Sequence, residues 1–164
     1  LYYCIQTKEG MKKKSFIFSA LILFCLISSA QILSPVKWSY SAKKIEKKSY
    51  ELHITAFIDD NWHLYSQDAG EHMLSTSFNF MMNSLVKLDV KVLELGNLKK
   101  VYDPNLRLTL KYYYEQVDFI QKIKMKSAAS TIVKGSVKYI VCSDKDRKCL
   151  PAKEIPFSIK IDGI

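Results

Sequence analysis

Apolar and polar residues alternate along most of the chain after residue 34, with the period of two that is typical of half-buried β-strands. In residues 50–58 every even-numbered residue is apolar, and in residues 155–161 every odd-numbered residue is apolar. We therefore expect eight or nine strands and no amphipathic helix. The predicted strands are residues 36–41, 50–58, 62–65, 77–80, 86–95, 106–114, 117–125, 132–141 and 155–161.

Short strands at close spacing favour a sandwich of two antiparallel sheets, with a closed barrel as the alternative architecture. Turn residues such as Asp59-Asp60-Asn61 separate the runs. The chain has 164 residues, of which 48% are hydrophobic and 25% are charged, and this composition is typical of one globular all-β domain. We find no internal repeat and no linker within it.

The N-terminal region has the three parts of a secretory signal peptide: Lys12, Lys13 and Lys14, an apolar run from residue 16 to 27, and the small residues Ser-Ser-Ala at 28–30. We predict that residues 1–10 are an over-called start, that residues 11–30 are the signal peptide and that residues 31–164 are the mature domain. The protein is then exported to the periplasm or cell envelope, and it meets the membrane only transiently. An uncleaved membrane anchor is the alternative.

The charge of the mature chain is mildly basic. Residues 1–30 hold four lysines and one glutamate, so their removal lowers the formal charge from +9 to +6. The remaining lysines are scattered along the predicted strands, without the basic cluster and interleaved aromatics that nucleic-acid binding requires. His53, His63 and His72 show no zinc-ligand spacing. We therefore expect neither a nucleic-acid partner nor a metal.

Two of the four cysteines, Cys142 and Cys149, remain in the mature chain. They flank six polar residues between two predicted strands, and we expect them on the stems of an exposed hairpin, where a disulfide can form. A disulfide that closes such a short loop stabilises a fold by roughly 2.5 kcal/mol, which describes a structural staple. A bond at an exposed tip is also accessible to an attacking thiolate, which describes a redox switch. The residues alone leave both interpretations open.

Four stretches, in this order, resemble the N-terminal periplasmic domain of the thiol–disulfide interchange protein DsbD. They are residues 35–39 (Pro-Val-Lys-Trp-Ser), 59–66 (Asp-Asp-Asn-Trp-His-Leu-Tyr-Ser), 101–104 (Val-Tyr-Asp-Pro) and 139–151, which contain both cysteines. The resemblance covers nearly all of residues 31–164. It implies an immunoglobulin-like antiparallel β-sandwich in the periplasm and a connection to cytochrome c biogenesis.

The resemblance also implies a catalytic pair, Cys142 and Cys149, that cycles between dithiol and disulfide without a bound cofactor. Cys149 would form the mixed disulfide and Cys142 would resolve it. Tyr102, Asp103 and Leu106 would belong to a cap loop over the pair, and Tyr65 would flank it.

As a protein-disulfide reductase, the domain would pass electrons from a thioredoxin-like or membrane donor to oxidised periplasmic client proteins. A non-catalytic immunoglobulin-like binding module with a structural disulfide is the alternative, since sandwich folds serve many functions. A third hypothesis is a subunit of an envelope assembly that pairs through an edge strand.

Overall fold

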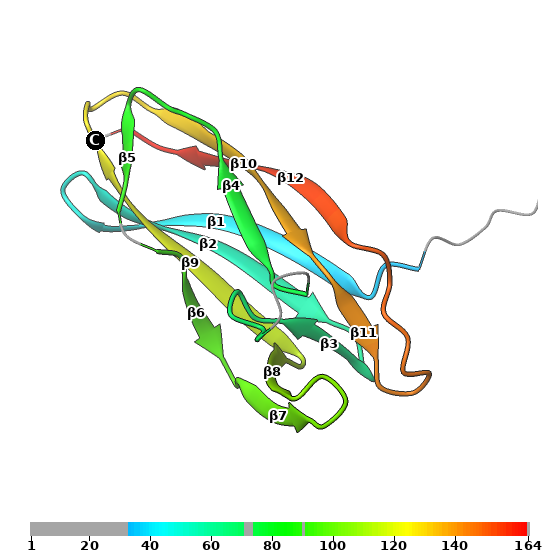
Figure 1. Ribbon diagram of the computed structural model, residues 1–164. Coiled ribbons are helices and arrows are strands. Elements are labelled where there is room, and N and C mark those ends of the chain that lie inside the picture. Colours follow the sequence, from blue (N-terminus) through cyan, green and yellow to red (C-terminus); the bar gives the residue numbers. More distant parts are fainter. Residues whose placement is uncertain (1–32, 71–73, 90, 164) are drawn as a thin grey trace, which may run out of the picture. The chain divides into compact units, whose positions relative to one another are not determined.

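The alternating runs form antiparallel strands in the computed structural model, which describes residues 33–70, 74–89 and 91–163 (Figure 1). The chain divides into two units, Leu1–Leu33 and Ser34–Ile164, and only the second is considered below. The over-called start and the signal peptide lie outside the described residues and stay predictions. Within the described ranges, no helix has the length and apolar character needed to cross a membrane.

Twelve strands occur in the described residues, in place of the eight or nine that were predicted. They are β1 (Val36–Glu46), β2 (Ser49–Ile58), β3 (Trp62–Tyr65), β4 (Ser77–Phe80), β5 (Val86–Leu88), β6 (Leu93–Gly96), β7 (Lys99–Asp103), β8 (Leu108–Tyr113), β9 (Gln116–Met125), β10 (Thr131–Tyr139), β11 (Val141–Ser143) and β12 (Lys153–Ile161).

The strands form three antiparallel sheets. The first sheet has the order β1-β2-β9-β5, and β6 also pairs with β9. The second sheet has the order β12-β10-β4, and the third has the order β11-β3-β8-β7. The ladders confirm the predicted alternation, because in β2 every even-numbered residue is buried.

The first and second sheets face each other across the main core. Phe119 of β9 has no exposed surface, and its ring centroid lies 4.9 Å from that of Phe78 on β4. The ring centroids of Trp38 on β1 and Tyr139 on β10 are 5.3 Å apart. Each fully buried aromatic or aliphatic side chain of this kind contributes roughly 1.5–3 kcal/mol. The predicted β-sandwich is therefore confirmed.

Several predicted strand limits were wrong: β1 continues to Glu46, β7 was not predicted at all, and three further differences have an evident cause. Residues 86–95 form two strands, β5 and β6, because the register against β9 shifts between them. Residues 132–141 are divided at Ile140, because β10 pairs in the second sheet and β11 pairs with β3 in the third. The strand expected to start at Leu106 begins at Leu108, because residues 104–107 form the turn that follows β7.

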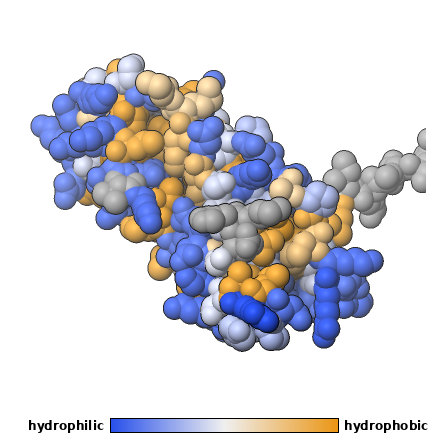
Figure 2. Space-filling view, viewed as in Figure 1, coloured by the Kyte–Doolittle hydropathy of each residue, from blue (hydrophilic) through white to orange (hydrophobic). Residues whose placement is uncertain are grey.

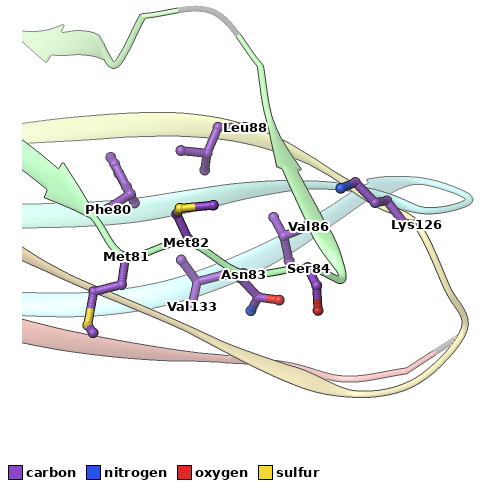
Figure 3. A pocket seen from close by; sticks show the side chains of 9 residues that line it. All are labelled: Phe80, Met81, Met82, Asn83, Ser84, Val86, Leu88, Lys126 and Val133. Carbon is purple, nitrogen blue, oxygen red and sulfur yellow. The ribbon is translucent and has the colours of Figure 1, made fainter.

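A cavity of about 670 Å³ lies between the end of β4 and β5. Met81, Met82 and Leu88 line it together with Phe80, Val86 and Val133 (Figure 3). Hydrophobic residues gather over β4 and the segment after it (Figure 2). The segment from β4 to β5 that lines this cavity is at the opposite end of the sandwich from β11, the strand that contains Cys142 (Figure 1).

Candidate functional site

The cysteines meet where the chain leaves β10 and enters the third sheet. Cys142 is the central residue of the three-residue strand β11 and pairs with His63 of β3 on one side. On the other side it faces Cys149 in an antiparallel bridge, with Cα atoms 3.9 Å apart, and the two form a disulfide. Backbone hydrogen bonds from Ser143 N to Lys148 O (2.9 Å) and from Leu150 N to Val141 O (3.0 Å) flank this pair.

The loop between the cysteines is closed by its own polar groups. Asp146 N donates to Ser143 Oγ at 3.2 Å, and Arg147 adopts a left-handed φ of 50° that turns the chain back. Asp144 N donates to Asn61 O at 2.9 Å, which ties the loop to the segment before β3. The disulfide is therefore held at the tip of an ordered hairpin, as predicted from the sequence.

The two cysteines differ in their exposure. Cys142 is only 3% exposed, whereas Cys149 is an exposed residue. An attacking thiolate must reach the sulfur that it attacks, and it displaces the other sulfur of the disulfide. It can reach Cys149 from solvent, and the bond that breaks then releases Cys142 as the leaving group.

Cys142 is covered by a small apolar cluster that is separate from the main core. Tyr65 and Ala69 are its other buried members, with 5% and 0% exposure. Partly buried residues complete it: Leu74, Leu110, Tyr112 and Ile140. The predicted flanking residue Tyr65 is therefore brought next to the pair.

The cluster is supported by the segment that follows β3. Lys111 N donates to Ala69 O at 3.4 Å, which holds this segment against β8. Gly70 has a φ of 88°, and an added Cβ would collide with the carbonyl oxygen of Thr109. Only glycine adopts this conformation readily at such a close approach.

An aromatic group from two neighbouring strands lies on the same face as Cys142. The ring centroid of His63 is 4.4 Å from that of Tyr112 and 5.3 Å from that of Tyr65. Tyr114 lies 5.5 Å from Tyr112 in an edge-on arrangement. His63 Nδ1 is 2.8 Å from Asp144 Oδ1, and the two side chains are 12% and 40% exposed.

Burial dominates the electrostatics of this face. It lowers the pKa of His63, although the hydrogen bond and charge of Asp144 act in the opposite direction. Burial also raises the pKa of Tyr65, with smaller contributions from Tyr112, Asp103 and Asp144. The pKa of Tyr114 is raised by burial and by its hydrogen bonds to Tyr112 and Asp144. At neutral pH both tyrosines are therefore protonated and His63 is neutral.

The predicted cap residues lie on the hairpin formed by β7 and β8. Asp103 Oδ1 accepts hydrogen bonds from the backbone N of Asn105 (2.8 Å) and Leu106 (3.1 Å), which shapes the turn. Asp103 shares the site face with Leu108, its partner in the ladder. Tyr102 is 61% exposed and on the opposite face, because side chains alternate along β7. Leu106 is 53% exposed at the tip.

No group of three or more histidine, cysteine or carboxylate side chains in the described residues could hold a metal ion. The site instead provides one exposed cysteine, one buried cysteine and a histidine, His63, that pairs with the buried cysteine in the β3–β11 ladder. Such a site can exchange disulfides with another protein through surface contact, and this chemistry requires no substrate cavity.

The fold is an antiparallel β-sandwich, and a disulfide with one exposed cysteine lies at its edge. These features define a class of protein with a site for thiol–disulfide chemistry. The family model described as "Thiol:disulfide interchange protein DsbD, N-terminal" matches residues 29–159. The chain belongs to this family of DsbD N-terminal domains, and the predicted resemblance is confirmed. No curated protein sequence matches the chain.

Solved structures extend the likeness at low sequence identity. The N-terminal periplasmic domain of ScsB from Proteus mirabilis matches with a TM-score of 0.54 and 13% identity, over 82% of this chain and 49% of that chain. The reduced DsbD N-terminal domain of Neisseria meningitidis matches with a TM-score of 0.48 and 12% identity, over 77% and 86% of the two chains. A complex between the DsbD and PilB N-terminal domains from the same species gives 0.46 and 12%, over 79% and 88%. The ScsB likeness concerns the fold alone, which is the immunoglobulin-like sandwich that was predicted.

Sequence reasoning missed three residues of the site: His63, Tyr112 and Asp144. One signal was available for the first, because His63 and Tyr65 are two residues apart in a predicted strand and therefore share a face. The approach of Asp144 and Tyr112 depends on long-range strand register, which the sequence does not reveal.

Proposed function

We propose that this domain carries out protein thiol–disulfide interchange in the cell envelope through Cys142 and Cys149. It accepts two electrons from a thioredoxin-like or membrane donor and passes them to oxidised periplasmic proteins, as a protein-disulfide reductase without a bound cofactor. Family membership supports interchange as the general activity. The donor and the clients are part of the proposal.

The observation that carries the assignment is the difference in exposure between the two cysteines. Cys149 is exposed and forms the mixed disulfide with donor or client. Cys142, at 3% exposure, is the resolving thiol, because no partner sulfur can approach it before the hairpin moves. Leu106 and Asp103 of the β7–β8 hairpin act as the cap in this proposal, whereas Tyr102 belongs to the same hairpin but lies on the opposite face of β7.

Trapping of mixed disulfides tests these roles. We would replace Cys4 and Cys25 with serine in the full chain, so that only the pair reports, and then compare Cys142→Ser with Cys149→Ser. Periplasmic extract and alkylation of free thiols provide the assay. Cys142→Ser is expected to accumulate mixed disulfides and Cys149→Ser is not. Equal trapping by the two variants contradicts the role assignment.

A redox titration separates electron transfer from a structural staple. We would equilibrate the same protein with defined thiol–disulfide buffers and measure the redox state of the pair by alkylation mass shift. A potential above about −300 mV is within the range of exchange proteins. A lower potential, with thiols that react only after unfolding, would indicate a binding module with a structural disulfide.

A further inference from the structure

The proposed exchange reaction passes through a thiolate on Cys142 in both directions. This sulfur either attacks as a thiolate to resolve a mixed disulfide or leaves as a thiolate when Cys149 is attacked. Cys142 is 3% exposed and packed among apolar residues, so water cannot readily solvate that charge. The reaction therefore needs a group beside Cys142 that takes up and returns its proton.

His63 has the position that such a group requires. It is the direct partner of Cys142 in the β3–β11 ladder, and residues opposite each other on one face of a sheet have Cβ atoms about 5 Å apart. Asp144, two residues beyond Cys142 on the same face, approaches His63 Nδ1 to 2.8 Å. A carboxylate only accepts, so the hydrogen of neutral His63 is on Nδ1 and the lone pair is on Nε2.

The groups around His63 leave its imidazole as the proton acceptor on the face of the sheet that contains Cys142. Burial lowers the pKa of His63, so the ring is neutral at pH 7 and can accept a proton. The neighbouring phenols cannot compete, because the pKa values of Tyr65 and Tyr114 are raised and both stay protonated. Four titratable side chains contact His63: Asp144 after β11, Tyr65 on β3, Tyr112 on β8 and Tyr114 after β8. Asp103 of β7 interacts electrostatically with Tyr65.

We propose that His63 is the proton acceptor and donor for Cys142 during disulfide exchange, and that Asp144 positions its imidazole. The inference rests on the proposed function and adds the group that makes the buried sulfur reactive near neutral pH. His63 acts on the reacting thiol itself, whereas Asp144 acts through His63.

Each bond and proton in the reaction is accounted for. In the reduced protein the Cys149 thiolate attacks a client disulfide, a mixed disulfide forms and one client thiolate leaves. The Cys142 thiol then transfers its proton to His63 Nε2, and its sulfur attacks Cys149 Sγ. The Cys142–Cys149 bond forms, the second client thiolate leaves with the electron pair, and His63 releases the proton to it or to solvent. Reduction by a donor is the reverse sequence, in which protonated His63 supplies the proton to Cys142.

A small aromatic disulfide, dithiobis(nitrobenzoate), resolves the two steps. It releases one coloured thiolate when Cys149 attacks and a second when Cys142 resolves the mixed disulfide. We would mix it with the reduced full chain, in the Cys4→Ser and Cys25→Ser background, and follow both phases by stopped flow from pH 5 to pH 9. The variants are His63→Gln and Asp144→Asn.

The pH profile of the second phase is the decisive measurement. With His63 as base, the rate is level at neutral pH and falls below the lowered pKa of His63. An unassisted thiol of pKa about 8.5 is only about 3% ionised at pH 7, so without the base the rate rises about tenfold per pH unit. His63→Gln is expected to slow the second phase at pH 7 by at least about tenfold, with the first phase unchanged. Asp144→Asn is expected to move the inflection to lower pH, because the Asp144 charge raises the pKa of His63.

The chain contains a matched control. His53 on β2 has the same kind of pair, with its Nδ1 2.6 Å from Asp118 Oδ2, but it is in the first sheet, which does not contain the cysteines. His53→Gln must leave both phases unchanged. The inference is overturned if the second-phase rate of His63→Gln is level around neutral pH. It is also overturned if the second-phase rate of the wild-type protein rises tenfold per pH unit. If wild-type protein releases no second thiolate at all, the proposed function itself fails.

Discussion

Glu94 of β6 connects three parts of the domain, and its removal gives a prediction with a defined magnitude. Oε2 accepts hydrogen bonds from Ser66 Oγ (2.8 Å) and Tyr113 Oη (2.7 Å), and Oε1 accepts one from Gln67 N (2.6 Å). Ser66 and Tyr113 are each only 3% exposed. Without Glu94 these buried donors lose their partner, and the segment that leads to Ala69 beneath Cys142 is released.

The magnitude follows from the number and environment of these bonds. A hydrogen bond to a charged group contributes roughly 1.5–3 kcal/mol when buried. Glu94 is half-buried, so we take about 1 kcal/mol for each bond. Glu94→Ala is therefore expected to lower the free energy of unfolding by about 3 kcal/mol. Glu94→Gln keeps the acceptor for Gln67 N, and its amide N–H groups can donate to the hydroxyl oxygens of Ser66 and Tyr113. Only the charge of the acceptor is then lost, so a smaller decrease of about 1 kcal/mol is expected.

Urea unfolding of the oxidised protein measures both values. The matched control is Glu154→Ala, which removes one exposed carboxylate bonded to Ser136 Oγ at 2.6 Å, and a change within about 0.5 kcal/mol is expected there. A second measurement is the rate at which Cys142 is alkylated in the Cys149→Ser variant, which Glu94→Ala should increase. A loss below about 1 kcal/mol in Glu94→Ala, or equal losses in the two alanine variants, refutes the reasoning.

Two further predictions concern the same end of the domain. Gly70→Ala should lower stability by more than about 1 kcal/mol, because residue 70 has a φ of 88° and the new Cβ would collide with the Thr109 carbonyl oxygen. Thermal unfolding measures this loss, and an unchanged midpoint temperature contradicts the prediction. Because the folded-state pKa of His63 is below its ordinary value, the unfolded chain binds a proton first as pH falls, so stability should decrease from about pH 7 downwards through the folded-state pKa. Urea unfolding between pH 5 and pH 8 should show that slope in wild-type protein and lose it in His63→Gln, and an identical slope in both contradicts the assignment.

The sandwich was predictable wherever one face of a strand is buried and the other is wet. β2 and β9 pair along nearly their whole length, and their alternating burial repeats the alternation in the sequence. Even Gln121, which occupies an inward position in that pattern, is buried at 3%. Its side-chain amide compensates for this by donating to Asp89 O at 2.6 Å.

The division of residues 86–95 into β5 and β6 was not predictable, because a register shift of two residues preserves the alternation. Leu88 pairs with Ile123 and Leu93 pairs with Ile120, so the connecting segment has two more residues than β9 over the same stretch. Even-numbered residues face inward before and after the shift, since Val86 pairs with buried Met125 and Glu94 pairs with buried Phe119. Only the pairing partners reveal the break, and the sequence does not specify them.

The cysteine pair was predictable and its surroundings were not. A hairpin with polar residues between Cys142 and Cys149 needs only local geometry. The aromatic face needs β3 to lie between β8 and β11 in one register, which brings His63 to Asp144 across 81 residues of sequence. From the sequence alone, His63 was considered as a metal ligand and rejected. Asp144 was only one of the polar residues between the two cysteines.

The unequal exposure of the two cysteines follows from the order of the strands. Cys142 has β3 on one side and the Cys149 segment on the other, and the cluster around Tyr65 covers its face. Cys149 is on the outermost segment of that sheet, beyond which the described residues contain no further strand. The chain reaches this edge because it leaves the second sheet at Ile140, after β10 has already anchored it between β12 and β4. Strand order therefore determines which cysteine is exposed. Exchanging the proposed roles of the two cysteines would require another strand outside Cys149, which no single substitution can supply.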